Sequence, residues 1–240
     1  MKFHYIKTMV LVSFLFLLTG CLYPDSERVE NQVPHETQLE MVQAAVDSYQ
    51  EQTDGLLPIR TKPSDTPIFE KYLIDFKLLK DQNAIAEIPG NAFENGGFYQ
   101  YILITPEEDP TVKLIDLRVT EALRSVYIRL EAFRQEHTYP PFGEKVEEGI
   151  YLVDYEKLKM DEPPTVVSPY SKEHLPIIMD VYGNLYIDYR KDLQRALNEY
   201  EHDYEEGDDI RYLLTDHTPF APTYSLPYTV KDGEPVFMEE

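Results

Sequence analysis

The amino-acid sequence predicts an α+β fold. It consists of two tandem helix–strand–hairpin units, in which helices pack on antiparallel sheet, followed by a third helix and an extended C-terminal tail. Three observations lead to this prediction: apolar residues recur at helical spacing in three stretches, β-type segments lie between them, and the motif Tyr-Leu-x-Asp occurs twice. Helices and hairpins in this order can bury their apolar faces against one another.

The first 21 residues carry a charged start, a short apolar run and a small residue before a cysteine. Lys2 and Lys7 precede the run from Met9 to Leu18, which is shorter than the roughly 20 residues that a membrane-spanning helix needs. The run ends in LTGC, residues 18–21, which resembles a lipobox, where the cysteine sulfur accepts a diacylglyceryl group. Cys21 is the only cysteine of the chain, so the exported domain must fold without disulfides. We expect Cys21 to be a lipid anchor rather than a buried core thiol.

The chain then divides into successive segments. These are a signal peptide over 1–20, the lipidated cysteine and a tether over 21–35, a first α/β unit over 36–117, a second α/β unit over 118–189, and a closing helix with the tail over 190–240. The tether is polar and lacks an apolar period, and its 14 residues after Cys21 reach at most about 50 Å when extended. The folded domain is therefore expected close to the membrane.

In the first unit, a helix is expected over 36–52, because its apolar residues recur at helical spacing and Asp54-Gly55 follows. A β-type segment, YLIDFKLL, is expected over 72–79. Strands over 98–104 and 112–117 are expected to form a hairpin.

The second unit is expected to begin with the longest helix, over 118–136. Its apolar stripe comprises Val119, Ala122, Leu123, Val126, Tyr127, Leu130 and Phe133. A strand over 150–155 and a hairpin over 175–189, turning at Gly183-Asn184, follow. A last helix is expected over 190–205, and the proline-rich tail is expected to hold one strand near 228–230 with little order in its second half.

The two units look like a duplication. YLIDFKLLK, residues 72–80, and YLVDYEKLK, residues 151–159, are identical at five of nine positions, and the elements around them keep the same order. The alternative is coincidence, since amphipathic helices match one another on apolar register alone. The shared Tyr-Leu-x-Asp motif favours duplication.

The chain is strongly acidic, with a net charge of −22 that becomes −24 once residues 1–20, which contain two lysines and no acid, are removed. Nucleic-acid binding needs the opposite sign, so no nucleic-acid partner is expected. Anionic lipid headgroups repel such a domain, so the lipid anchor alone is expected to hold it at the membrane.

No catalytic motif is found. The histidines show no zinc-binding spacing, the acidic cluster at 205–209 lacks the pattern of a calcium loop, and glycine-rich phosphate loops are missing. We therefore predict no catalytic residue, metal ligand or cofactor. The binding candidates are tyrosines in one hairpin–helix region: Tyr182, Tyr186, Tyr189, Tyr200 and Tyr204. Such residues can anchor a partner, although core packing explains the same pattern.

Three stretches carry a resemblance: CLYPDSERVENQVPHETQLEMVQAAVDSYQEQTDGLLPI from Cys21 onward, PGNAFENGGFYQYIL, and YLVDY. Together they resemble a group of uncharacterised lipoproteins of Bacillus and related spore-forming Gram-positive bacteria. The resemblance extends over nearly the whole chain and implies attachment to the outer face of the cytoplasmic membrane. It implies no activity and no site residues.

Three functions remain open. The first is a non-catalytic envelope lipoprotein that binds an envelope protein or a cell-wall component. The second is a solute-binding lipoprotein of a transporter, which would show two lobes around a cleft. The third is a hydrolase acting on wall or lipid material, which would show converging carboxylates or a Ser/His/Asp cluster. The sequence favours the first.

Overall fold

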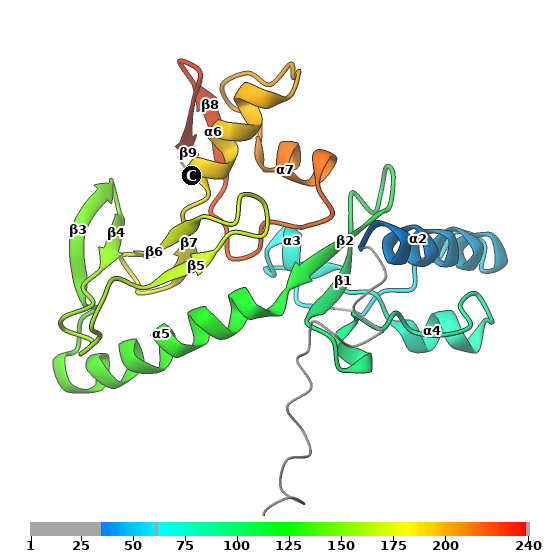
Figure 1. The fold of residues 1–240 in the computed structure, drawn as a ribbon, viewed down its shortest axis with the longest axis horizontal. Coiled ribbons are helices and arrows are strands. Elements are labelled where there is room, and N and C mark those ends of the chain that lie inside the picture. Colours follow the sequence, from blue (N-terminus) through cyan, green and yellow to red (C-terminus); the bar gives the residue numbers. More distant parts are fainter. Residues whose placement is uncertain (1–34, 61, 239–240) are drawn as a thin grey trace, which may run out of the picture. The chain divides into compact units, whose positions relative to one another are not determined.

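The computed structural model describes residues 35–60 and 62–238, and it confirms an α+β fold with antiparallel sheets (Figure 1). The residues from His35 onward form one compact unit. The predicted signal peptide, Cys21 and nearly all of the tether lie outside the described residues.

The first half of the described chain holds four helical segments and one hairpin. They are α2 (His35–Gln52), α3 (Ile68–Lys71), α4 (Phe76–Asp81), the 3-10 turn η3 (Phe93–Asn95), β1 (Tyr99–Ile104) and β2 (Thr111–Asp116). The predicted first helix and the hairpin are confirmed, with β1 and β2 paired antiparallel. A buried cluster around Val46, Leu79 and Tyr101 forms the core of this half.

The predicted strand over 72–79 is wrong for most of its length. Only Leu73 and Ile74 form isolated β-bridges, and α4 begins at Phe76. The cause is Asp75, whose side chain accepts a hydrogen bond from the backbone N–H of Lys77 and so caps the helix. A carboxylate that satisfies one of the free N–H groups of the first turn favours a helix start over a continued strand.

The second half begins with the longest helix and continues into a five-stranded sheet. Its elements are α5 (Leu117–His137), β3 (Phe142–Glu147), β4 (Ile150–Val153), β5 (Thr165–Val167), β6 (His174–Asp180), β7 (Leu185–Ile187) and α6 (Arg190–Glu199). β4, β5 and β7 all pair antiparallel with β6, and β3 pairs with β4. The long helix, the strand at 150 and the β6–β7 hairpin were predicted, whereas β3 and β5 were not.

Two details of the predicted helices are wrong. Tyr127 is exposed, because it lies beside the buried stripe of Val119, Leu123, Val126 and Leu130 and not within it. The last predicted helix ends at Glu199 instead of 205, so Tyr204 lies outside it. Acidic residues crowd the segment after Glu199, and negative charge is unfavourable at a helix C-terminus.

The order of strand pairing is the same in both halves. In the first, Ile59 bridges to Ile74, Leu73 bridges to β1, and β1 pairs with β2. In the second, β3 pairs with β4, β4 with β6, and β6 with β7. The repeated motif occupies the second position each time, and Asp154, like Asp75, accepts a backbone hydrogen bond from the turn that follows. This order is what a duplication requires; superposition of the two units stays a prediction.

The C-terminal segment forms α7 (Arg211–His217), β8 (Tyr228–Lys231) and β9 (Glu234–Phe237). The prediction of little order in its second half is therefore wrong, because Tyr228 and Phe237 pack into the core of the second half. The segment also joins the first half: Leu114 of β2 donates a backbone hydrogen bond to Pro219, 2.8 Å, and accepts one from Ala221, 2.9 Å. Aromatic and apolar side chains recruit this segment into the core despite its prolines.

Candidate binding site

Three helices of the structure begin with the same Asp-x-Arg arrangement. The pairs are Asp116 with Arg118 at α5, Asp188 with Arg190 at α6, and Asp209 with Arg211 at α7. In each pair one carboxylate oxygen accepts hydrogen bonds from the backbone N–H and the Nε of the arginine, and the other accepts one from Nη2. We call this arrangement the Asp-x-Arg clamp. At α5 the clamp combines a helix cap with a two-point ion pair, because Asp116 is the N-cap of the helix. At α6 and α7 the aspartate lies one residue before the N-cap, and the ion pair joins it to the first residue of the helix.

The clamps differ in what surrounds the arginine. The Arg211 side chain is 8% exposed, its Nη1 donates to the Ser225 carbonyl at 3.1 Å, and its guanidinium lies 5.0 Å from the centre of the Phe69 ring. The Arg118 side chain is 57% exposed. The clamp at α5 therefore presents its arginine to the outside, whereas the clamp at α7 buries it.

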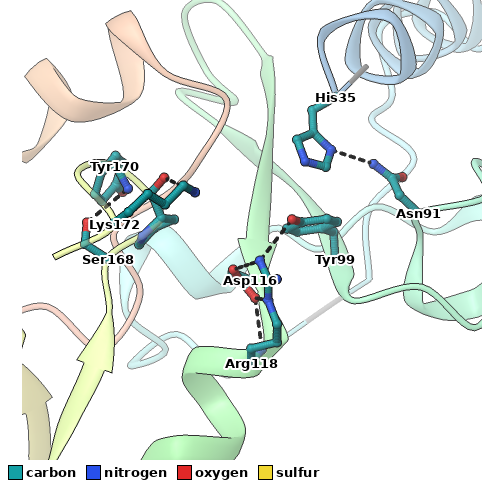
Figure 2. Close-up of polar contacts among 9 residues, drawn as sticks. His35, Asn91, Tyr99, Asp116, Arg118, Ser168, Tyr170 and Lys172 are labelled. Carbon is teal, nitrogen blue, oxygen red and sulfur yellow. Dashed lines mark hydrogen bonds and ion pairs between the residues drawn. The ribbon is translucent and has the colours of Figure 1, made fainter. Parts of the chain in front are cut away.

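A cavity of about 450 Å³ lies between the first turn of α5 and the segment that runs from β5 into β6. Its lining residues are Asp116, Arg118, Val119, Ala122, Thr165, Val166, Val167, Ser168, Pro169 and Lys172. Figure 2 shows Arg118 beside Asp116 at the centre of the view, and it shows Ser168 and Lys172 to the left of this pair. The charged lining groups are two bases and one acid, in a chain that carries twice as many acids as bases overall.

Arg118 is held in place by two neighbours besides its own backbone. Its Nη2 donates to Asp116 Oδ2 at 2.6 Å and to the Tyr99 hydroxyl at 3.1 Å. The hydrogen bonds that Arg118 donates to Asp116 raise the pKa of Arg118, so the guanidinium is charged at any physiological pH. Asp116 is only 6% exposed and accepts three hydrogen bonds from Arg118. Its carboxylate is thus fully engaged in the clamp.

Lys172 reaches the cavity from the loop between β5 and β6, and a buried carboxylate on α6 fixes this loop. Ser168 Oγ donates to Asp192 Oδ2 at 2.7 Å and accepts the backbone N–H groups of Tyr170, 3.0 Å, and Ser171, 3.1 Å. Burial raises the pKa of Asp192, and the hydroxyls of Ser171 and Ser168 oppose this effect. Among the described residues, no carboxylate forms an ion pair with Lys172.

Next to the cavity lies a small aromatic group. The His35 ring is 4.7 Å from the Tyr99 ring and 5.9 Å from the Phe220 ring, and Asn91 Nδ2 lies 3.3 Å from His35 Nδ1. Burial lowers the pKa of His35, and the charges of Lys172 and Arg118 add to this effect, while Glu36 and Asp116 oppose it. Burial is therefore the main reason that the pKa of His35 is lowered.

The tyrosines predicted as binding candidates are dispersed. Tyr189 is a core residue whose hydroxyl donates to the Thr223 carbonyl at 3.1 Å. Tyr200 is half-buried and stacks on His217, with 3.7 Å between ring centres, and Tyr204 is half-buried too. Tyr182 and Tyr186 share the β6–β7 hairpin, where both hydrogen-bond to Asp180. Tyr182 is 75% exposed, so of the five it is the best placed for a partner.

The sequence-based candidates did not include Arg118 or Lys172. A signal for Arg118 is present, since IDLR, IDYR and DDIR recur at three predicted or observed helix starts. Lys172 has no comparable signal, because only the folding of the β5–β6 loop against α5 brings it to the cavity.

The described residues contain neither a helix that could span a membrane nor a group of side chains that could bind a metal ion. No helix in residues 35–60 or 62–238 is both long and apolar enough to span a membrane. The same residues hold no group of three or more His, Cys, Asp or Glu side chains placed to bind a metal ion.

Residues 35–116 match the model of the YphF family N-terminal domain. The match begins at the first residue of α2 and ends at Asp116, the carboxylate of the exposed clamp, so it covers the first helix–strand–hairpin unit. No curated protein and no solved structure matches the chain.

Proposed function

We propose that this protein is a lipid-anchored binding module at the outer face of the cytoplasmic membrane, which acts by contacting a partner and not by catalysis. The observation that carries the binding role is the cavity in which Arg118 and Lys172 are held at fixed positions. The lipobox-like sequence at 18–21 supports the anchor.

The chemistry of the cavity suits binding better than hydrolysis. Arginine and lysine stay protonated at neutral pH, so they attract an anion without exchanging a proton. The lining carboxylate, Asp116, accepts hydrogen bonds from the backbone N–H, Nε and Nη2 of Arg118 and is poorly placed to act as a general base.

The cationic groups are also preorganised. Asp116 orients Arg118, and Asp192, through Ser168, fixes the loop that carries Lys172. Groups that are already ordered lose little conformational entropy on binding, which favours affinity from a small contact. A modest interface is therefore sufficient.

The position of the cavity fits a partner near the membrane. The tether from Cys21 enters the domain at His35, whose ring contacts Tyr99, and Tyr99 contacts Arg118. A tether of this length confines the domain to a layer of about 50 Å. Confinement raises the effective concentration of any partner in that layer, either an envelope protein or a cell-wall component.

The anchor is tested by Cys21→Ala in a Bacillus host, with radioactive fatty-acid labelling and membrane fractionation. We expect the substitution to abolish labelling and to move the protein from the membrane to the medium, because the thiol is the lipid acceptor. The folded domain should melt at the temperature of the wild type. Continued acylation of the variant would refute the anchor, and turnover of wall or lipid material by the purified protein would refute the binding role.

A further inference from the structure

One edge of β5 has no strand partner within residues 35–60 and 62–238. Among the described strands, β5 pairs with β6 alone. Ser168 donates its backbone N–H to Glu173, 2.8 Å, and Ile177 donates to Pro164, 3.1 Å, so the backbone groups of residues 164, 166 and 168 point toward β6. Backbone groups alternate in direction along an antiparallel strand. The N–H and C=O groups of Thr165 and Val167 therefore point away from the sheet.

This edge borders the cavity and belongs to a strand of only three residues, whose shortness is itself one protection against unwanted pairing. Thr165, Val166 and Val167 all line the cavity. Sheet proteins normally shield an edge strand with a charged residue, a proline or a covering segment, because an open edge pairs with any free strand. β5 itself contains only threonine and valines. A free edge without charged residues, beside a preformed cavity, can accept an added strand.

The opposite wall of the cavity supplies an apolar surface and a cationic end. Val119 and Ala122 of α5 also line the cavity, so an apolar side chain of an extended chain paired beside β5 could pack on them. Arg118 is in the first turn of α5 and Lys172 follows the end of β5, and both line the cavity. The N-terminus of the 21-residue helix α5 adds its positive dipole there.

We propose that this cavity binds an extended peptide, which pairs with the outer edge of β5 and places a carboxylate between Arg118 and Lys172. The carboxylate is either the C-terminus of the partner chain or an Asp or Glu side chain. The proposal rests on the binding role proposed above, but it does not depend on the lipid anchor.

The test uses the full-length protein in detergent and fluorescein-labelled random hexapeptides in three pools. One pool has a free C-terminal carboxylate and no acidic side chain, a second is amidated with one internal Asp, and a third is amidated without any acid. We expect the first or the second pool to bind at least about tenfold more tightly than the third by fluorescence polarisation, which corresponds to roughly 1.4 kcal/mol. Equal binding of all three pools would overturn the proposal.

Two substitutions separate the carboxylate from the strand pairing. Lys172→Gln should weaken the acid-dependent part of the binding about tenfold. The matched control is Lys159→Gln, since Lys159 is also an exposed lysine with a positive φ, 56° against 63° for Lys172, but lies outside the cavity. Val167→Pro removes an N–H that does not bond to β6, so the sheet should persist while all pools lose affinity.

Amide hydrogen exchange gives a readout that needs no substitution. Binding of the pool should slow exchange at Thr165 and Val167, whose N–H groups face outward, with little change at Val166. Unchanged exchange at Thr165 and Val167, or binding of inorganic phosphate that saturates the site while no peptide pool binds, would reduce the cavity to a simple anion site and overturn the proposal. Peptide binding by a protein that is never acylated would refute the anchor alone.

Discussion

The clamps at α5 and α7 make the same hydrogen bonds between aspartate and arginine, but the aspartate is the more buried partner at α5 and the arginine is the more buried partner at α7. At α5 the aspartate is 6% exposed and the arginine 57%, whereas at α7 the aspartate is 24% exposed and the arginine 8%. The Asp-x-Arg hydrogen bonds lie at the helix start in both cases, and their geometry is complete within three residues. Which partner meets solvent depends on the surroundings, here Phe69 and Ser225 around Arg211. The same motif therefore serves as a core contact at one helix and as an exposed cation at another.

The clamp at α6 is intermediate and supports this interpretation. Arg190 is partly exposed, and its guanidinium lies 4.9 Å from the centre of the Phe237 ring of β9. A cation over an aromatic face gains stability without a second hydrogen-bonding partner. The C-terminal segment thus partly covers the second clamp, and it leaves the first clamp open.

The largest expected loss of stability comes from disrupting α5, the helix that carries the exposed clamp. Leu123→Asp places a carboxylate on the buried stripe of α5, where Leu123 is 4% exposed. Burying such a charge without a partner costs several kcal/mol, comparable to the whole stability of a typical domain of about 5–15 kcal/mol. Thermal unfolding of the purified protein measures this. The control is Tyr127→Asp on the exposed flank, and equal melting temperatures for the two variants would contradict the assigned stripe.

The second-largest expected effect is the difference in stability lost when the clamp at α7 or the clamp at α5 loses its arginine. Arg211→Ala should destabilise the protein by about 3 kcal/mol, because it leaves the Ser225 carbonyl and Asp209 without a buried partner. Arg118→Ala should cost about 1 kcal/mol, because Asp116 lines the cavity, where water can take the place of the guanidinium, and Asp116 still accepts the backbone N–H of residue 118.

Urea unfolding of both variants at one pH is the measurement. Equal losses of stability would show that exposure does not distinguish the two clamps. A loss of peptide or anion binding in Arg118→Ala alone, at preserved stability, would strengthen the assignment of Arg118 to the site.

The smallest effect concerns the carboxylate that fixes the loop of Lys172. Asp192→Asn keeps an acceptor for Ser168 but removes a buried charge, so it should leave the loop in place. Burial raises the pKa of Asp192, which means that the folded state holds the proton more tightly than the unfolded chain. The contribution of this group to stability therefore falls as pH rises from its ordinary pKa through the raised one.

The stability of Asp192→Asn relative to the wild type should increase over that same pH range and then level off. Asp192→Ala is the companion variant, because it removes the acceptor and should weaken any binding that depends on Lys172. Urea unfolding of Asp192→Asn and of the wild type between pH 3 and pH 8 would measure this change in relative stability. A wild type that gains stability relative to the asparagine variant as pH rises would show that the pKa is not raised.

Much of the fold could be predicted because the signals are local. The stripe of α5, the β1–β2 hairpin and the Gly183-Asn184 turn follow from side-chain periodicity and turn chemistry, and the structure confirms them. The errors occur where a single polar residue or a distant partner decides. Asp75 converts a predicted strand into a helix start, and Tyr228 and Phe237 draw the tail into the core.

The sequence by itself determined the α+β class, the acidic charge and the lipobox-like segment, because each depends on residues that are neighbours along the chain. Tertiary structure alone decided that Arg118 is the most exposed of the three clamp arginines, that β5 pairs with β6 alone among the described strands, and that Lys172 lines the same cavity as α5. These features depend on contacts such as the one between Ser168 and Asp192, 24 residues apart. Burial and hydrogen bonding between distant segments set them, and no local pattern encodes which segments will meet.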